Sequence, residues 1–215
     1  MRQFGWVGLF GIVLGIVCSI MGYSLKNEMA FSLMNHTLSE LGTYSHSPLA
    51  VVVNGGLFFG SLSLVLSLLM SLQIAKHGLG YLFVLLFSLS YIALAAVGLF
   101  PTNVYHLHVL ALKWFFYLGC GSALLFVVYL GLVQDALFAK WTVIPALLTL
   151  LSQSAFLFIP HLELGITAND RPFYLEMILQ TPRQALWWPA IIEWLSVTCW
   201  LVWSASLLSG LRKTQ

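Results

Sequence analysis

The sequence predicts an all-α fold: a polytopic membrane helical bundle with six transmembrane helices and short interfacial helices on the outer side. Two observations predict it. The first is a set of six stretches that are long and apolar enough to cross a bilayer. The second is composition, because the 215 residues are 60% hydrophobic and only 7% charged, whereas a soluble domain has about 25% charged residues. We expect a single transmembrane domain over residues 1–215, since little of the chain lies outside these stretches.

Each predicted span reaches or approaches the roughly 20 residues that a hydrocarbon core about 30 Å thick requires. The first span follows a short positive start at Arg2, but it is longer than the core of a signal peptide and no cleavage pattern follows it. We therefore interpret it as a retained helix. The predicted spans are residues 4–25, 48–72, 78–100, 109–133, 142–160 and 189–211.

Two pairs of glycines with Gly-x-x-x-Gly spacing lie inside these spans. Gly11 and Gly15 belong to the first span, and Gly56 and Gly60 to the second. Small residues at this spacing let two helix backbones approach closely. The pairs predict helix contacts, either within one chain or between copies.

The positive charges indicate which end of the bundle faces the cytoplasm. Lys and Arg divide unevenly between the two sides, and the richer side has the shorter loops, where the positive-inside rule is most reliable. We expect a bacterial inner (plasma) membrane with both termini cytoplasmic. The formal net charge of +2 indicates no nucleic-acid partner. The inner side has Arg2, Lys76, Lys140, Arg212 and Lys213, and the outer side has Lys26, Lys113, Arg171 and Arg183.

The outer segment between the first two spans predicts a short helix at the membrane surface. Apolar residues recur at helical spacing over residues 30–41, and Gly42 suits a C-cap. In this register polar residues four apart share a face, namely Asn35 with Ser39 and His36 with Glu40.

The long outer segment before the last span predicts a second interfacial helix. Asp170 suits its N-cap, Pro172 its first turn, and Gln180 its end. Its apolar side would consist of Phe173, Met177 and Ile178. Trp187 and Trp188, just before Pro189, are typical of an aromatic belt at the membrane surface.

Two histidines, His106 and His108, lie where the third span ends and the fourth begins. In an extended backbone their side chains would point the same way and could share a metal. In a helix they would diverge by about 200° and could not chelate as a pair. The apolar pattern that continues into Lys113 favours the helix. Lys113 would place a charge close to the hydrocarbon core. Either its long side chain extends to the membrane surface, or the charge has a functional role.

Glu193 and Asn54 lie inside the sixth and second spans, both near the outer side. A carboxyl group at such depth is a default candidate for a functional site. We expect these residues to join the outer polar groups in one extracytoplasmic pocket, or else in a hydrogen-bond network that only holds the helices together. The candidate pocket residues are His36, Ser39, Glu40, Asn54, His106, His108, Lys113 and Glu193.

Four short motifs follow one another along the chain, namely Ser39-Glu40-Leu41-Gly42, Asn54 with Gly55-Gly56, Gly98-Leu99-Phe100-Pro101, and either His106 or His108. Their order resembles the membrane family catalogued as domain of unknown function 998 (DUF998), whose members have an I-S-E-L-G-like motif, an Asn-x-Gly, a G-x-F-P and a following His. The resemblance covers roughly residues 20–130 and implies six helices with no settled activity.

The chain departs from the family pattern at two positions. Leu38 replaces an Ile before Ser39, a conservative change. Asn103 stands where an Asp is expected after the Phe-Pro pair. Any ligand or base role of that Asp would therefore not apply to this chain.

Three functions remain open from the residues alone. In the first, the chain binds or handles membrane lipids, or supports another membrane protein or a second copy, and needs no cofactor. In the second it is a membrane-embedded hydrolase in which zinc, held by His106 and His108 with His36 or Glu40, activates water against a lipid ester or amide. In the third it is a proton- or ion-coupled carrier using Glu193 and Lys113. Whether the chain is an enzyme is not determined by its sequence.

Overall fold

In this computed structural model, the described residues include six helices that are long and apolar enough to cross a membrane. The structure describes residues 2–26, 31–44, 46–134, 136–162, 171–176 and 185–211. The predicted all-α class and the six spans are confirmed, and the chain has the architecture of an integral multi-pass membrane protein. The spanning helices are α1 (Arg2–Lys26), α3 (Ala50–Ser71), α4 (Gly78–Leu99), α5 (Tyr105–Leu132), α6 (Val143–Phe158) and α8 (Trp188–Gly210).

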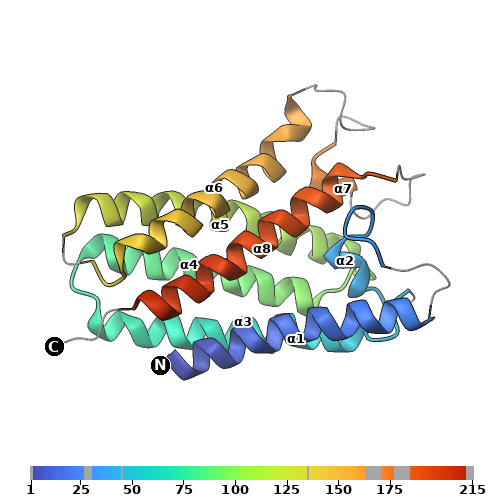
Figure 1. The fold of residues 1–215 in the computed structure, drawn as a ribbon, viewed down its shortest axis with the longest axis horizontal. Helices are drawn as coiled ribbons and strands as arrows, with labels where there is room; N and C mark the ends of the chain where they lie inside the picture. The colour runs from blue at the N-terminus through green and yellow to red at the C-terminus, as the bar shows by residue number, and fades with distance from the viewer. Residues whose placement is uncertain are drawn as a thin grey trace.

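Shorter helices lie at the ends of these spans. Three 3-10 turns, η1 (Leu72–Ile74), η2 (Lys140–Thr142) and η3 (Ile159–His161), extend α3 or flank α6. Two one-turn α-helices, α2 (Leu38–Leu41) and α7 (Phe173–Glu176), lie between spans. Both are at the same end of the bundle in Figure 1, which we call the α2 end.

Helix α5 begins earlier than its apolar pattern predicts. Its first residue is Tyr105 instead of residue 109, and the amide of His108 already donates to the carbonyl of Val104 at 3.0 Å. A hydropathy pattern does not include this polar first turn, because hydropathy depends on the side chains whereas helical hydrogen bonds are made by the backbone. Both histidines of this segment are therefore helical.

The spanning helices pack side by side in chain order, and α8 completes the arrangement by contacting both α6 and α1. In Figure 1, α8 runs diagonally across the bundle. Its Trp200 and Trp203 are fully buried and reach Phe87 of α4, with ring centroids 4.6 and 4.7 Å apart. An aromatic core in the middle of the bundle thus connects α8 to α4.

The predicted glycine pairs form the contact between α1 and α3. A Cβ atom on Gly56 would lie 2.7 Å from the carbonyl oxygen of Gly11, and one on Gly60 would lie 2.6 Å from that of Gly8. Only glycine allows the two backbones to approach so closely. These faces are used within one chain.

Both ends of the described chain lie at the end of the bundle opposite α2. The guanidinium of Arg2 donates to the carbonyl oxygen of Leu211, and the amide of Ala139 donates to the carbonyl of Gly210 at 2.8 Å. We call this the terminal end. The chain therefore enters and leaves the bundle on one side (Figure 1).

The first predicted interfacial helix is much shorter than expected. Residues 33–35 form a turn, and the helix covers only Leu38–Leu41, followed by Gly42 as C-cap. Its start is set by a capping box: the Thr37 hydroxyl accepts from the amide of Glu40 at 3.2 Å, and Glu40 Oε2 accepts from that of Thr37 at 2.9 Å. The predicted helical pairs of Asn35 with Ser39 and of His36 with Glu40 are therefore wrong.

The second predicted interfacial helix is described only in part. Helix α7 begins directly after Pro172, whose carbonyl accepts from the amide of Leu175 at 2.8 Å. Asp170, the expected N-cap, and residues 177–180 lie outside the described residues. The last span begins at Trp188, with Pro189 in its first turn.

Candidate functional site

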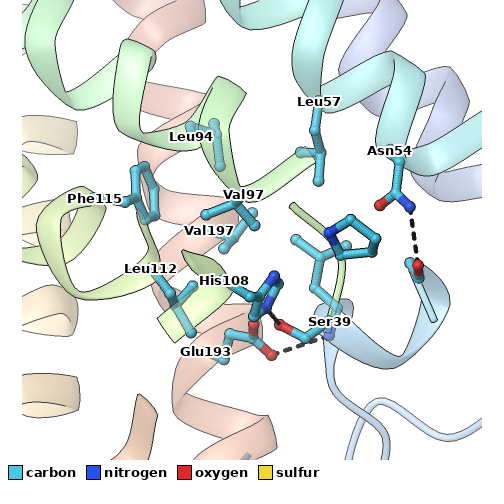
Figure 2. Close-up of a pocket in the computed structure, with 13 residues that line it drawn as sticks. Ser39, Asn54, Leu57, Leu94, Val97, His108, Leu112, Phe115, Glu193 and Val197 are labelled. Carbon is cyan, nitrogen blue, oxygen red and sulfur yellow. Dashed lines mark hydrogen bonds between the residues drawn. The ribbon is translucent and has the colours of Figure 1, made fainter. Parts of the chain in front are cut away.

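A small cavity lies at the α2 end of the bundle, between α2 and the ends of α3, α4, α5 and α8 that are nearest to it (Figure 2). Its volume is about 10 Å³, near the smallest that holds one water molecule. Four polar side chains line it: Ser39, Asn54, His108 and Glu193. Apart from Gly42, the rest of the lining is apolar and is called the apolar wall below; it consists of Leu38, Leu57, Leu94, Val97, Pro101, Leu112, Phe115 and Val197.

Ser39 and His108 are bonded to each other across the cavity. Ser39 Oγ lies 3.0 Å from His108 Nε2, and His108 Nδ1 lies 2.7 Å from the carbonyl oxygen of Phe100. A carbonyl only accepts, so Nδ1 has the proton. In the uncharged imidazole Nε2 is then the acceptor, and the Ser39 hydroxyl donates to it (Figure 2).

Glu193 is a carboxyl group buried in the second turn of α8, with 1% of its surface exposed. Its Oε2 accepts from the amide of Leu38 at 3.0 Å, the first amide of α2. Among the described residues, no Lys or Arg lines the cavity. The carboxyl group therefore lines the cavity without an ammonium or guanidinium group beside it among the lining residues.

Asn54 attaches the end of α2 to α3. Its Nδ2 donates to the carbonyl of Gly42 at 2.9 Å, and a Cβ atom on Gly42 would lie 2.5 Å from Asn54 Oδ1. On its other side, a Cβ atom on Gly98 would lie 2.6 Å from the Asn54 carbonyl oxygen. Both glycines are required because a side chain at either position would displace Asn54.

Residues 31–44 cover the cavity and are held to the helices by further hydrogen bonds. Trp194 Nε1 donates to the carbonyl of His36 at 2.8 Å, and the amide of Tyr44 donates to Asn103 Oδ1 at 3.2 Å. Asn103 therefore secures this covering segment and does not line the cavity.

The other four predicted pocket residues lie elsewhere. The His36 imidazole stacks on Phe31 with centroids 5.2 Å apart, and Glu40 completes the capping box. His106 is exposed. Lys113 Nζ lies 5.9 Å from the ring centroid of Tyr117. None of the four lines the cavity, so the cavity contains half of the predicted set.

The structure does not form the predicted metal pair. His106 and His108 both lie in the first turn of α5, where His108 is buried and His106 is exposed. Side chains two apart on a helix diverge. Over the described ranges, no group of three or more His, Cys, Asp or Glu side chains is placed to hold a metal ion.

Sequence reasoning missed the groups that position the site. The Phe100 carbonyl orients His108, and Phe100 precedes Pro101, a residue pair whose backbone leaves the helix at this point. Thr37 with Glu40 has the spacing of a capping box. Both signals are present in the sequence, but each indicates local backbone geometry and says nothing of what lies across the bundle.

Fold and site together define a polytopic membrane protein with a closed polar cavity at one end of its bundle. No family model matches the chain, and no match is found among curated proteins or among solved structures. The resemblance to DUF998 is thus not supported by a family model. Its motifs nevertheless meet in space, because Ser39, Gly42, Asn54, Pro101 and His108 all line the cavity.

Proposed function

We propose that the chain binds the polar head of a membrane lipid in the cavity beneath α2. The supporting observation is the division of the cavity into a polar side and an apolar wall, inside a bundle built for a membrane. A lipid has the same division, with a polar head joined to an apolar chain. Polar side chains buried at membrane depth cost free energy, which favours a functional use for them.

The cavity favours an uncharged head group. Its lining contains the carboxyl group of Glu193 and, among the described residues, no Lys or Arg to compensate a phosphate. Burying an unpaired charge is costly. Hydroxyl or amide hydrogens can be donated to the carboxyl group of Glu193, so the proposed ligand is a neutral lipid with a hydroxyl-bearing head.

Entry of a lipid requires the covering segment, residues 31–44, to move, because a cavity of about 10 Å³ holds no more than one water. That segment is attached through separate hydrogen bonds, which include those of Trp194 to His36, Leu38 to Glu193 and Asn54 to Gly42. Each contributes only about 0.5–1.5 kcal/mol. We propose that the covering segment opens to admit the ligand and closes over it.

A photoreactive, uncleavable ether analogue of monoacylglycerol tests this function in nanodiscs. We expect crosslinks to map to peptides that line the cavity. Val197→Phe, which fills the apolar wall, should lower these crosslinks at least fivefold. The matched control is Leu195→Phe on the exposed side of the same helix, which should leave them unchanged. Crosslinks spread evenly over the lipid-facing helices of the wild type would overturn the proposal, whether or not Val197→Phe folds.

The family and the orientation belong to the same proposal. Convergence of the four motifs on one cavity supports a relationship to DUF998. The shorter connections and additional positive charges at the terminal end support a cytoplasmic position for it. The cavity would then open toward the extracytoplasmic leaflet.

A further inference from the structure

The strongest chemical feature of the cavity is the contact between Ser39 and His108. We propose that Ser39 is a nucleophile and His108 its general base, and that the site cleaves a carboxylic ester of the bound lipid. The inference rests on the proposed function, because the ester must first enter this cavity. It adds a reaction that binding alone does not require.

The direction of the hydrogen bond is the one that this chemistry needs. The Phe100 carbonyl accepts from His108 Nδ1 at 2.7 Å and so fixes the tautomer. His108 Nε2 then accepts from the Ser39 hydroxyl at 3.0 Å. A serine becomes a useful nucleophile when an adjacent base, itself oriented by a third group, can take its proton. In this chain the third group is a backbone carbonyl.

Ser39 differs from the buried serines that bond within their own helices. The hydroxyls of Ser88 and Ser122 donate to carbonyls of their own helices, at 2.7 and 2.8 Å, as expected of serine in an apolar helix. Ser39 Oγ instead bonds to an imidazole from another helix and lines a cavity. A side chain with a purely local backbone role would not need this partner.

Both members of the pair are held in place when the covering segment is closed, as it is in this structure. The capping box and the bond from the Leu38 amide to Glu193 fix the start of α2, and with it Ser39. The Phe100 carbonyl fixes His108. Such positioning lowers the entropic cost of reaching the reactive geometry.

The proposed reaction balances with water as the only co-reactant. Ser39 Oγ bonds to the ester carbonyl carbon while His108 Nε2 takes the hydroxyl proton. The carbon–alkoxide bond then breaks, and Nε2 returns the proton to the leaving alcohol. Water next attacks the acyl-Ser39 ester with His108 again as base, which releases a carboxylic acid and restores Ser39. The apolar wall of the cavity suits the acyl chain, and the absence of Lys and Arg from the described lining favours an uncharged alcohol.

A long-chain alkyl fluorophosphonate tests the nucleophile directly on the full chain in detergent. Ser39 Oγ would bond to phosphorus as fluoride leaves, giving one adduct that intact mass and peptide mapping locate. We expect the adduct on Ser39 and none in Ser39→Ala. His108→Gln should slow its formation at least 100-fold, because a general base contributes about 10²–10⁴ in rate.

The controls are a buried serine and an exposed histidine, Ser122→Ala and His106→Gln, and both should label at the wild-type rate. The same variants should rank identically in hydrolysis of a fluorogenic monoacylglycerol-like ester. No wild-type adduct, an adduct elsewhere than Ser39, or equal rates in folded His108→Gln would overturn the inference. Ser39→Ala should still crosslink the uncleavable lipid. A wild-type chain that crosslinks this lipid but forms no adduct on Ser39 rejects only the reaction. A wild-type chain that neither crosslinks at the cavity nor forms the adduct rejects the binding function as well.

Discussion

Glu193 connects the last helix to the one-turn helix that holds Ser39. Its carboxyl group accepts from the Leu38 amide, and without it that buried amide would lack an acceptor. A buried donor left unpaired costs about 1–3 kcal/mol. The side chain therefore has a structural role even in the absence of a ligand.

We predict that Glu193→Ala lowers the free energy of unfolding by about 1–3 kcal/mol, measured by SDS titration in mixed micelles. Glu193→Gln should lose less than about 1 kcal/mol, since its amide oxygen can still accept from Leu38. Leu195→Ala, at an exposed position on the same helix, serves as the control. Equal losses for Ala and Gln would show that the bond to Leu38 does not stabilise the fold.

Gly98 offers a second test at the scale of single residues. A Cβ atom there would lie 2.6 Å from the Asn54 carbonyl and 2.9 Å from Leu57 Cβ, so Gly98→Ala forces α3 and α4 apart. We predict a loss of about 1–3 kcal/mol in the same titration. Gly55→Ala, where a Cβ atom meets nothing within 4 Å, should cause no loss. The packing account fails if the two variants unfold alike.

At the scale of elements, the six spans could be predicted because hydropathy and length alone select them. The polar ends of the helices were harder to predict. Helix α5 starts at Tyr105 and α2 at Leu38, and in both cases the start is set by local hydrogen bonds that an apolar pattern does not detect. The expected helix over residues 30–41 failed because Thr37 starts a new helix.

We predict that Thr37→Ala costs about 1 kcal/mol of stability, the usual value of an N-cap. It should also slow fluorophosphonate labelling of Ser39, because α2 loses the bond that fixes its first turn. Thr37→Ser keeps a hydroxyl at the cap and should behave like the wild type. Labelling that is as fast in Thr37→Ala as in wild type would mean that the cap does not position Ser39.

At the scale of the whole molecule, an even number of crossings places both termini on one side, as the contact of Arg2 with Leu211 also requires. We predict that fluorescent-protein fusions at either terminus fluoresce and that alkaline phosphatase fusions at either terminus are inactive. This pattern is expected for cytoplasmic termini in a bacterial inner membrane. Active phosphatase at both termini would invert the proposed orientation, and activity at only one would contradict the fold.

The site could be predicted only in part, for a reason that belongs to the whole bundle. Asn54, His108 and Glu193 were recognisable as polar residues near the same end of three spans. Which side of its helix each residue faces depends on how the helices pack, and this separates buried His108 from exposed His106. The carbonyl of Phe100 could not be selected at all, because every residue has one.

The account depends most on the contact between Ser39 and His108 in the folded bundle. A double-mutant cycle of Ser39→Ala and His108→Ala, read as free energy of unfolding in mixed micelles, tests it directly. We predict a coupling of about 0.5–1.5 kcal/mol, the size of one hydrogen bond, and additivity within about 0.5 kcal/mol for Ser39→Ala with His106→Ala. Additive effects of Ser39→Ala and His108→Ala would contradict the account.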